Sequence, residues 1–203
     1  MPMILDIPQY SDEWWFEKLG KPSASKMDRI ITPSGKPSKQ AESYLHELCA
    51  ERLSGLSANT YQSANMEEGL RREAESRQLF EFIHDVQVEE VGMVFYDETK
   101  RFLASPDGIV NREYGLELKN VLPKTQVSYL LKGGLPSDYF VQVQTSLFIS
   151  GFYKWAFFSY SPGLPPLDLI VPRDNVFIAK LKRLLDDFCE ELDAVTDRLR
   201  ALQ

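Results

Sequence analysis

The apolar residues of this chain change their spacing near Val86, and this change limits the folds that the chain can adopt. Before it, residues 41–49 and 65–84 carry apolar residues three and four positions apart, which predicts two amphipathic helices. After it, stretches rich in branched and aromatic residues predict strands at 88–95, 102–104, 115–121, 153–160 and 168–171. The chain is therefore predicted to have an α/β fold.

A helix-length segment, residues 137–150, separates the third predicted strand from the fourth. A strand, a helix and a strand in that order predict a crossover between parallel strands, whereas the earlier strands are close enough in sequence for antiparallel hairpins. We therefore expect a central mixed β-sheet flanked by helices. With 203 residues the chain is long enough for one sizeable core, so residues 1–203 are predicted to form a single domain.

The C-terminal segment carries an apolar seam in which spacings of four and three residues alternate. Its members are Leu181, Leu185, Phe188, Leu192, Val195, Leu199 and Leu202. Such a seam is typical of a helix that packs along another helix. Packing against the core is the favoured use, and contact with another subunit is the second.

The charge of the chain limits how it can contact nucleic acid. The 30 acidic residues exceed the 23 basic residues, and the net charge of −7 excludes a protein that holds nucleic acid by bulk positive charge. Residues 18–39, however, contain six basic side chains and one acidic side chain, Asp28, a local charge of +5 that favours contact with a DNA backbone. A solvated loop is the alternative. Lys124 and Lys132 lie in an acid-free stretch and could extend this track.

Cysteine content and hydropathy indicate the compartment. Cys49 and Cys189 are too few for a zinc ribbon or an iron–sulfur cluster and lie on apolar helical patterns, so both are predicted to be buried thiols. No stretch approaches the roughly 18 apolar residues of a membrane span, and no basic region precedes the first apolar residues. We therefore expect a cytoplasmic protein without a signal peptide or a membrane partner.

The segment from residue 104 to residue 120, ASPDGIVNREYGLELKN, carries the clearest chemical signal. Because residues two apart on a strand point to one face, Glu117 and Lys119 project together while the leucines between and before them point into the core. Asp107 lies between a proline and a glycine, which predicts a turn that faces the next strand across a hairpin. The three charged side chains can therefore converge. A solvated hairpin with a surface Glu–Lys pair is the alternative.

A further carboxylate, Glu73, interrupts the apolar face of the helix predicted at 65–84. A charge in that place requires a partner or a cation. Arg77, one helical turn later, offers an ordinary ion pair, and metal binding is the other use; the sequence leaves both open. Three carboxylates and a lysine in one cleft can hold one or two Mg²⁺ ions and hydrolyse a phosphodiester, so hydrolysis of nucleic acid fits this set.

Pro106-Asp107 is followed ten residues later by Glu117-Leu118-Lys119. Further matching segments are SPDG at 105–108, GLELK at 115–119, Gly69…Glu73…Arg77 followed by LFEF at 79–82, QVQ-x-S at 142–146, and Trp14…Leu19-Gly20…Ala24-Ser25. In this order, and over residues 14–150, the chain resembles the PD-(D/E)xK nuclease superfamily and, within it, the phage lambda exonuclease (YqaJ-type viral recombinase) family. The resemblance implies a restriction-endonuclease-like core.

The resemblance also implies residue roles in a catalytic centre. Asp107 and Glu117 match metal ligands, the Leu118 carbonyl matches a further possible ligand, and Lys119 matches a catalytic lysine. Glu73 matches the helix-borne acid of the same centre.

Other matched positions concern the surroundings of that centre. Gln144 matches the glutamine that approaches the active centre, and Gln142 is the weaker candidate. Lys18, Ser25 and Ser105 match residues that line the pocket for the 5′-phosphate of the digested strand. Because the family favours arginine where this chain has Lys18, and a lysine lacks the guanidinium fork, weaker phosphate affinity or selectivity is expected.

The function implied by the resemblance is 5′-to-3′ digestion of one strand of linear double-stranded DNA, which leaves a 3′ single-stranded tail for recombination by strand annealing. The implied cofactor is Mg²⁺, as two ions, with Mn²⁺ as a substitute. Implied partners are DNA ends, two further copies in a toroidal homotrimer, and a single-strand-annealing protein in a bacterial host carrying a phage or prophage. One rival is another nuclease of the superfamily, an endonuclease or repair enzyme, which would cut circular DNA. A second rival is a DNA-end-binding module with a degenerate site, which the complete set of Asp107, Glu117 and Lys119 disfavours.

Overall fold

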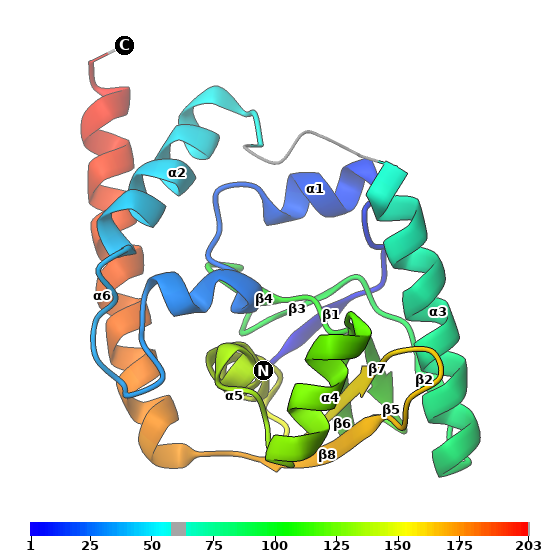
Figure 1. The fold of residues 1–203 in the computed structure, drawn as a ribbon. Helices are drawn as coiled ribbons and strands as arrows, with labels where there is room; N and C mark the ends of the chain where they lie inside the picture. The colour runs from blue at the N-terminus through cyan, green and yellow to red at the C-terminus, as the bar shows by residue number, and fades with distance from the viewer. Residues whose placement is uncertain (58–63, 203) are drawn as a thin grey trace.

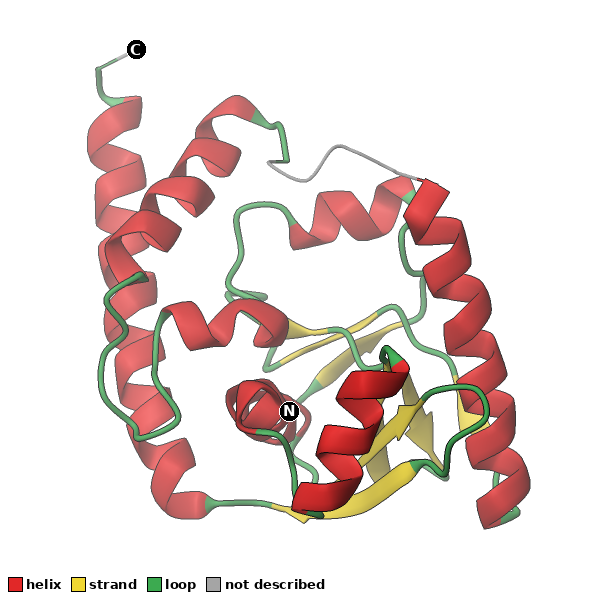
Figure 2. Cartoon of the chain, in the orientation of Figure 1, coloured by secondary structure: helices red, strands yellow, loops and turns green. Residues whose placement is uncertain are grey.

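The computed structural model describes residues 1–57 and 64–202 of the chain. Its helices are α1 (Asp12–Lys18), the 3₁₀-helix η1 (Ala24–Arg29), α2 (Ala41–Ser54), α3 (Ala64–His84), α4 (Pro123–Lys132), α5 (Ser137–Ser150) and α6 (Asn175–Arg200). Its strands are β1 (Met3–Leu5), β2 (Val88–Glu89), β3 (Met93–Phe95), β4 (Leu103–Ala104), β5 (Gly108–Val110), β6 (Tyr114–Asn120), β7 (Lys154–Tyr160) and β8 (Leu167–Pro172). Figures 1 and 2 show their arrangement.

The strands form two sheets. A five-stranded sheet has the order β2-β5-β6-β7-β8, in which β6 and β7 pair in parallel and the other neighbours pair antiparallel. The chain runs from β6 to β7 through α4 and α5, so the predicted parallel crossover with a helix at 137–150 is confirmed. The remaining strands form a three-stranded antiparallel sheet with the order β1-β3-β4.

Helices cover both faces of the five-stranded sheet (Figure 1). On one face α3 packs on β6 and β7 through a cluster that includes Phe80, Leu116 and Phe158. On the other face the alternate residues of β7, Trp155 and Phe157, join the largest core cluster together with apolar residues of α5. The predicted mixed sheet flanked by helices is therefore confirmed. Within the described part of the chain, no helix combines the length and apolar composition that a membrane crossing requires.

The predicted strand at 88–95 is wrong as a single element. β2 belongs to the five-stranded sheet and β3 to the three-stranded sheet, so the chain changes sheets at residues 90–92. At Gly92 an added Cβ would lie 2.3 Å from the carbonyl oxygen of Ile7, because the chain here passes directly against the N-terminal segment. That segment supplies β1, a three-residue strand too short to give a periodic signal. The sequence patterns likewise do not predict the helices α1, η1 and α4 or the three-residue strand β5.

The apolar seam near the C-terminus lies along α6, which packs against α2 on the side of the molecule away from α3 (Figure 1). The seam residues from Leu181 to Leu192 are buried in the core, Val195 and Leu199 are partly buried, and Leu202 is 79% exposed. Core packing, the favoured use, is confirmed for most of the seam. Cys49 and Cys189 are both free and buried, as predicted.

Candidate active site

A β-hairpin holds Asp107 against β6. The backbone N–H of Asp107 donates to the carbonyl oxygen of Leu116 at 3.1 Å, and its carboxylate accepts a hydrogen bond from the N–H of Leu118 at 2.6 Å. The expectation that Asp107 faces the next strand is confirmed. The predicted position of the turn is wrong, because the chain reverses at Asn111 and Arg112, whose φ angles of 50° and 58° belong to the left-handed region.

Two glycines of the motif allow close approach of neighbouring strands. A Cβ at Gly115 would lie 2.2 Å from the indole ring of Trp155, its partner in β7. A Cβ at Gly108 would lie 2.1 Å from a methyl group of Val88. The absence of a side chain at these two positions therefore lets β2 lie against β5 and lets Trp155 of β7 lie over β6.

Alternation along β6 separates charge from core. Leu116 and Leu118 pack on the side of α3, whereas Glu117 and Lys119 share the opposite face. The ammonium group of Lys119 pairs with Glu117 Oε1 and lies 5.1 Å from the centroid of the Tyr139 ring. Only 2% of the Glu117 side chain is exposed, so the alternative of a solvated surface pair is wrong.

A glutamine of α5 completes the surroundings of Glu117. Gln142 Nε2 donates to Glu117 Oε1 at 2.7 Å. The prediction that Gln144 approaches this centre is wrong, because its amide group donates to the carbonyl of Pro172 at 2.9 Å and accepts from the N–H of Asp174 at 2.8 Å. Two positions on a helix differ by about 200°, so only one of the two glutamines can face β6. Gln144 instead fixes the connection between β8 and α6.

Helix α3 brings Glu73 to the same site through Arg77. Arg77 Nη2 lies 2.8 Å from Glu73 Oε1, and its Nη1 lies 2.8 Å from Glu90 Oε1. Arg77 Nε also donates to the carbonyl oxygen of Asp107 at 3.3 Å. The helical ion pair that the sequence left open is therefore present, and it ties α3 to the β5–β6 hairpin.

Below, Glu73, Asp107 and Glu117 are called the carboxylate cluster. Burial and the neighbouring Glu117 raise the pKa of Asp107 well above its usual range, against the opposing effect of Lys119. Burial also raises the pKa of Glu73, although Arg77 opposes this shift. For Lys119, burial alone lowers the pKa, but the negative charges of Glu117 and Asp107 raise it further than burial lowers it. Negative charge is thus in excess at this place.

A cleft of about 450 Å³ opens beside the cluster and is lined by Glu73, Arg77 and Glu90 together with residues of the N-terminal segment. Tyr10 belongs to this lining and has a φ of 65°. Tyr10 and Glu73 line the same cleft, and burial together with the charges of Glu73 and Asp107 raises the pKa of the Tyr10 hydroxyl. The sequence prediction missed Tyr10, and the only signal for it was an aromatic residue in an otherwise loop-like N-terminus.

A second polar pocket, of about 40 Å³, lies where α1, η1 and α2 meet. We call it the lysine pocket, since Lys18, Lys21 and Lys26 line it together with Ser23 and Tyr44. Burial and the charge of Lys26 lower the pKa of Lys18 to about 8. The ammonium group of Lys18 also lies 4.3 Å from the centroid of the Trp14 ring.

The structure brings only some of the predicted phosphate-binding residues together. Ser25 is exposed, and its hydroxyl lies 3.3 Å from that of Ser23, which itself lines the lysine pocket. Ser105 is not among the lining residues; its hydroxyl is buried, with no hydrogen-bond partner in the described part of the chain. The predicted surplus of +5 is also reduced, because Arg29 pairs with Glu47 at 2.6 Å and Lys21 lies 3.9 Å from an acid of α1.

The donor atoms at the carboxylate cluster fit a divalent metal ion of the magnesium type. Within residues 1–57 and 64–202, Glu73, Asp107, Glu117 and Glu90 face two cations, Lys119 and Arg77, so a further positive charge is favoured. Among the described residues, no group of three or more acidic, histidine or cysteine side chains is close enough to enclose an ion. Magnesium is commonly bound through one or two carboxylates, with water and substrate phosphates in the other positions, and Asp107 and Glu117 suit that pattern.

Comparison with known proteins identifies the class to which this fold and site belong. The fold is that of exonucleases: a crystal structure of an alkaline exonuclease (LHK-Exo) from Laribacter hongkongensis is similar with a TM-score of 0.83 and 27% identity over 94% of this chain and 97% of that chain. A structure of LHK-Exo in complex with dAMP gives a TM-score of 0.82 at the same identity and coverage. A phage-related exonuclease from Haemophilus somnus 129PT shares the fold, with a TM-score of 0.66 and 15% identity over 88% of this chain and 96% of that chain.

The particular family follows from the sequence of residues 13–153, which match the YqaJ-like viral recombinase domain. The chain belongs to this family, of the lambda exonuclease type. A comparison with curated proteins found no similar sequence.

Proposed function

We propose that this protein is a metal-dependent exonuclease that digests one strand of linear double-stranded DNA from its 5′ end. The family and the similarity to an alkaline exonuclease support the broader statement, a nuclease that acts on DNA. One observation carries the proposal most directly: Asp107, Glu117 and Lys119 converge on the protected face of one hairpin. The 5′-to-3′ direction and the 3′ tails left for strand annealing come from the family resemblance.

We propose that Asp107 and Glu117, with the Leu118 carbonyl, hold Mg²⁺ as the cofactor, in two ions, and that Mn²⁺ substitutes for it. When bound, such ions make water a stronger nucleophile and polarise the phosphodiester. Lys119 supplies a fixed positive charge next to Glu117, suited to negative charge that develops on the phosphate oxygens. Glu73, on its own helix, adds a carboxylate at the edge of the cleft.

Gln142 takes the place that Gln144 was predicted to occupy. By donating to Glu117 Oε1, it orients one ligand carboxylate and leaves the second oxygen of that carboxylate for other contacts. We therefore propose Gln142 as a residue that positions Glu117.

We propose that the lysine pocket receives the 5′-phosphate of the strand being digested. Lys18, Lys21 and Lys26 supply positive charge, and Ser23 and Ser25 supply hydroxyl groups at its margin. Each cut regenerates a terminal phosphate, so a pocket for that group can hold the next scissile bond at the carboxylate cluster. Ser105 stays a candidate because its buried hydroxyl is unpartnered within the described residues and lies two positions before Asp107.

The assembly proposed from the resemblance is a toroidal homotrimer that works with a single-strand-annealing protein. A chain with a net charge of −7 repels a polyanion unless its basic segments line one surface, and a ring that turns residues 18–39 inward meets this requirement. Light scattering tests the ring. A monomer at micromolar concentration with full processive activity would exclude it.

One assay tests the proposed reaction. The protein is incubated with Mg²⁺ and three duplexes: linear with a 5′-phosphate, linear with a 5′-hydroxyl, and circular. We expect digestion of the linear duplexes only, with the 5′-phosphorylated one faster, and survival of the strand that ends in the 3′ tail. Cleavage of circular DNA would instead make the protein an endonuclease.

A further inference from the structure

A tight turn separates the two lysines at the end of α1. The N–H of Lys21 donates to the carbonyl oxygen of Lys18 at 3.2 Å. Leu19 has φ −55° and ψ 127°, and Gly20 has φ 65°, which match a type II turn with glycine in its third position. The direction in which the two lysines enter the lysine pocket therefore depends on how this turn is held.

Two consecutive residues of α2 hold both polar groups of the Gly20 backbone. The N–H of Gly20 donates to Glu51 Oε2 at 2.9 Å, and its carbonyl oxygen accepts from Arg52 Nε at 2.7 Å. The fit is close, because a Cβ at Gly20 would lie 2.4 Å from Arg52 Cγ. Arg52 thus contacts the turn through both its guanidinium group and its aliphatic stem.

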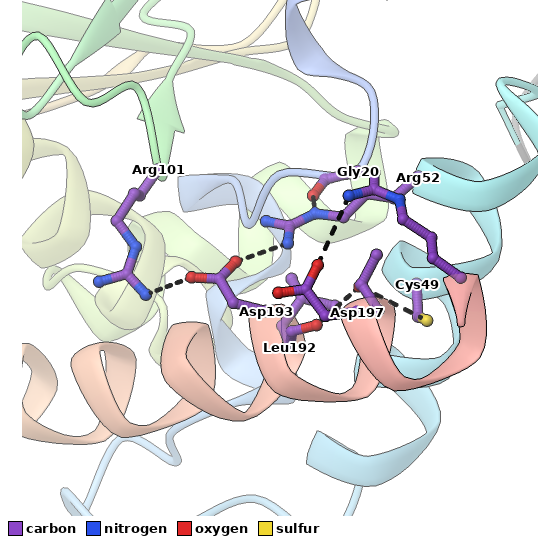
Figure 3. Close-up of polar contacts among 9 residues, drawn as sticks. Gly20, Cys49, Arg52, Arg101, Leu192, Asp193 and Asp197 are labelled. Carbon is purple, nitrogen blue, oxygen red and sulfur yellow. Dashed lines mark hydrogen bonds and ion pairs between the residues drawn. The ribbon is translucent and has the colours of Figure 1, made fainter.

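The guanidinium group of Arg52 is itself held from α6. Arg52 Nη1 lies 2.7 Å from Asp193 Oδ1, and the other oxygen of Asp193 lies 2.8 Å from Arg101 Nη2 (Figure 3). Figure 3 shows Asp193 between the two arginines, with Gly20 on the far side of Arg52. Asp193 of α6 therefore joins α2 to the connection between β3 and β4, and Arg52 extends this link to the turn after α1.

We propose that Arg52 and Asp193 are positioning residues for the lysine pocket. They hold the turn at residues 19–20, and through it they fix the relative placement of Lys18 and Lys21 toward one phosphate group. This inference rests on the proposed function of the pocket. It also gives α6, which lies outside the family match at residues 13–153, a role in substrate recognition beyond its apolar seam.

The chain offers variants of graded severity and a matched control. Arg52→Met removes the hydrogen bond to Gly20 and the ion pair with Asp193 but keeps an apolar stem beside the turn. Asp193→Asn is milder, since it keeps a hydrogen-bond acceptor on a side chain that is 48% exposed. Asp197→Asn is the control, because it removes the same charge one turn further along α6, where Asp197 lies 3.6 Å from Arg200.

The readout is the ratio of kcat/KM for the 5′-phosphorylated duplex to kcat/KM for the 5′-hydroxyl duplex, measured in the presence of Mg²⁺. The melting temperature of each variant is measured as well, to show that it is folded. We expect this ratio to fall by about threefold in Asp193→Asn and by about tenfold in Arg52→Met, the range of one or two lost hydrogen bonds. The rate on the 5′-hydroxyl duplex should stay within about twofold of the wild-type rate, and Asp197→Asn should leave the ratio unchanged.

Lys18→Ala is measured in parallel to separate two kinds of failure. If Lys18→Ala abolishes the phosphate preference while folded Asp193→Asn and Arg52→Met retain it, the positioning role is wrong and the proposed pocket stands. If Lys18→Ala keeps the preference, the proposal that the lysine pocket binds the 5′-phosphate is wrong, and the positioning role of Arg52 and Asp193 is wrong with it. Should Arg52→Met fail to fold, Asp193→Asn alone decides, and an equal loss on both duplexes in that variant overturns the inference.

Discussion

The carboxylate cluster and the lysine pocket differ in how their charges are balanced. In the cluster, opposite charges meet: Lys119 pairs with Glu117, and Arg77 pairs with Glu73. In the lysine pocket three lysines gather beside Glu47 and Glu51, and burial together with the charge of Lys26 lowers the pKa of Lys18 to about 8, against the opposing effect of Glu51. The carboxylate cluster thus has more negative than positive charge, which favours a cation, whereas the lysine pocket presents three lysines to an incoming anion. The comparison indicates one site for chemistry and a separate site for recognition.

The largest expected effect is the loss of digestion when the metal ion is removed, because the carboxylate cluster is proposed to bind the ion and the lysine pocket is not. Chelation with EDTA should abolish digestion, and Mg²⁺ or Mn²⁺ should restore it, because the carboxylate cluster requires a cation and the lysine pocket does not. Calcium takes more ligands at longer distances, about 2.3–2.6 Å against about 2.0–2.1 Å for magnesium, so it should permit DNA binding without cleavage. A nuclease assay and a filter-binding assay on the same linear duplex measure this. Rapid digestion in Ca²⁺ alone would contradict the proposed metal site.

The next effect concerns Lys119. Lys119→Ala should lower kcat by about 10²- to 10³-fold, the scale for removal of one preorganised charge that stabilises a transition state. Lys154→Ala is a matched control, because Lys154 also lies over a tyrosine ring, at 4.6 Å from the Tyr114 centroid, but is exposed at the start of β7. Single-turnover rates at saturating Mg²⁺ give the comparison. A wild-type rate in Lys119→Ala would remove this residue from the chemistry.

Loss of one charge from the lysine pocket should act on one substrate only. Lys18→Ala should slow digestion of the 5′-phosphorylated duplex by about ten- to a hundredfold, since a charge-assisted hydrogen bond contributes roughly 1.5–3 kcal/mol. The rate on the 5′-hydroxyl duplex should change little. Lys39→Ala, in an exposed position of the same basic segment, is the control. Equal slowing on both duplexes would make Lys18 a general contact with the DNA backbone.

The two glutamines of α5 provide a smaller, internal comparison. Gln142→Leu should lower kcat by about three- to tenfold with little change in melting temperature, because it removes one hydrogen bond to Glu117. Gln144→Leu should instead leave kcat nearly unchanged and lower the melting temperature by several degrees, about 2–4 °C per kcal/mol for a chain of this size. The physical reason is that the N–H of Asp174 and the carbonyl of Pro172 lose their partner. Calorimetry and turnover on the same preparations separate the two; the reverse pattern would restore Gln144 to the active centre.

Local sequence was sufficient to predict the core of the carboxylate cluster. Asp107, Glu117 and Lys119 lie within thirteen positions on one hairpin, where the two-residue period of a strand decides which side chains share a face. The same local pattern could not show which glutamine, Gln142 or Gln144, contacts Glu117. Both candidates lie on α5, and the face that meets β6 depends on how the whole helix docks.

Long-range contacts explain what the sequence did not predict. Arg52 and Asp193 are 141 positions apart, and nothing in their local patterns indicates that they meet. The break in the predicted strand at 88–95 has the same origin, because it depends on the N-terminal segment passing against Gly92. The strands β6, β7 and β8 and the crossover were predictable from periodicity, whereas the three-residue strand β5 was not, and the support of the lysine pocket comes from tertiary packing.

The smallest effect is a pH dependence confined to the lysine pocket. Folding lowers the pKa of Lys18 to about 8, so its cation is present below that pH and is lost as the pH rises through it. The ordinary lysine pKa of about 10.4 would keep the charge over this range. The preference for a 5′-phosphorylated over a 5′-hydroxyl duplex should therefore fall by about threefold between pH 7.5 and pH 8.5, in proportion to the cationic fraction.

The lowered pKa of Lys18 also makes the free energy of unfolding depend on pH. A buried lysine with a lowered pKa destabilises the fold in its charged form, fully below about pH 8, and this cost disappears as the pH rises toward the unfolded value. Lys18→Met should therefore stabilise the protein at pH 7 and lose that advantage by pH 10, as measured by urea unfolding. Lys18→Arg, whose guanidinium stays charged, should keep the phosphate preference constant between pH 7.5 and pH 8.5. If the wild type and Lys18→Arg lose the preference in parallel, the titrating group lies outside the lysine pocket and the contrast between the two sites fails at this point.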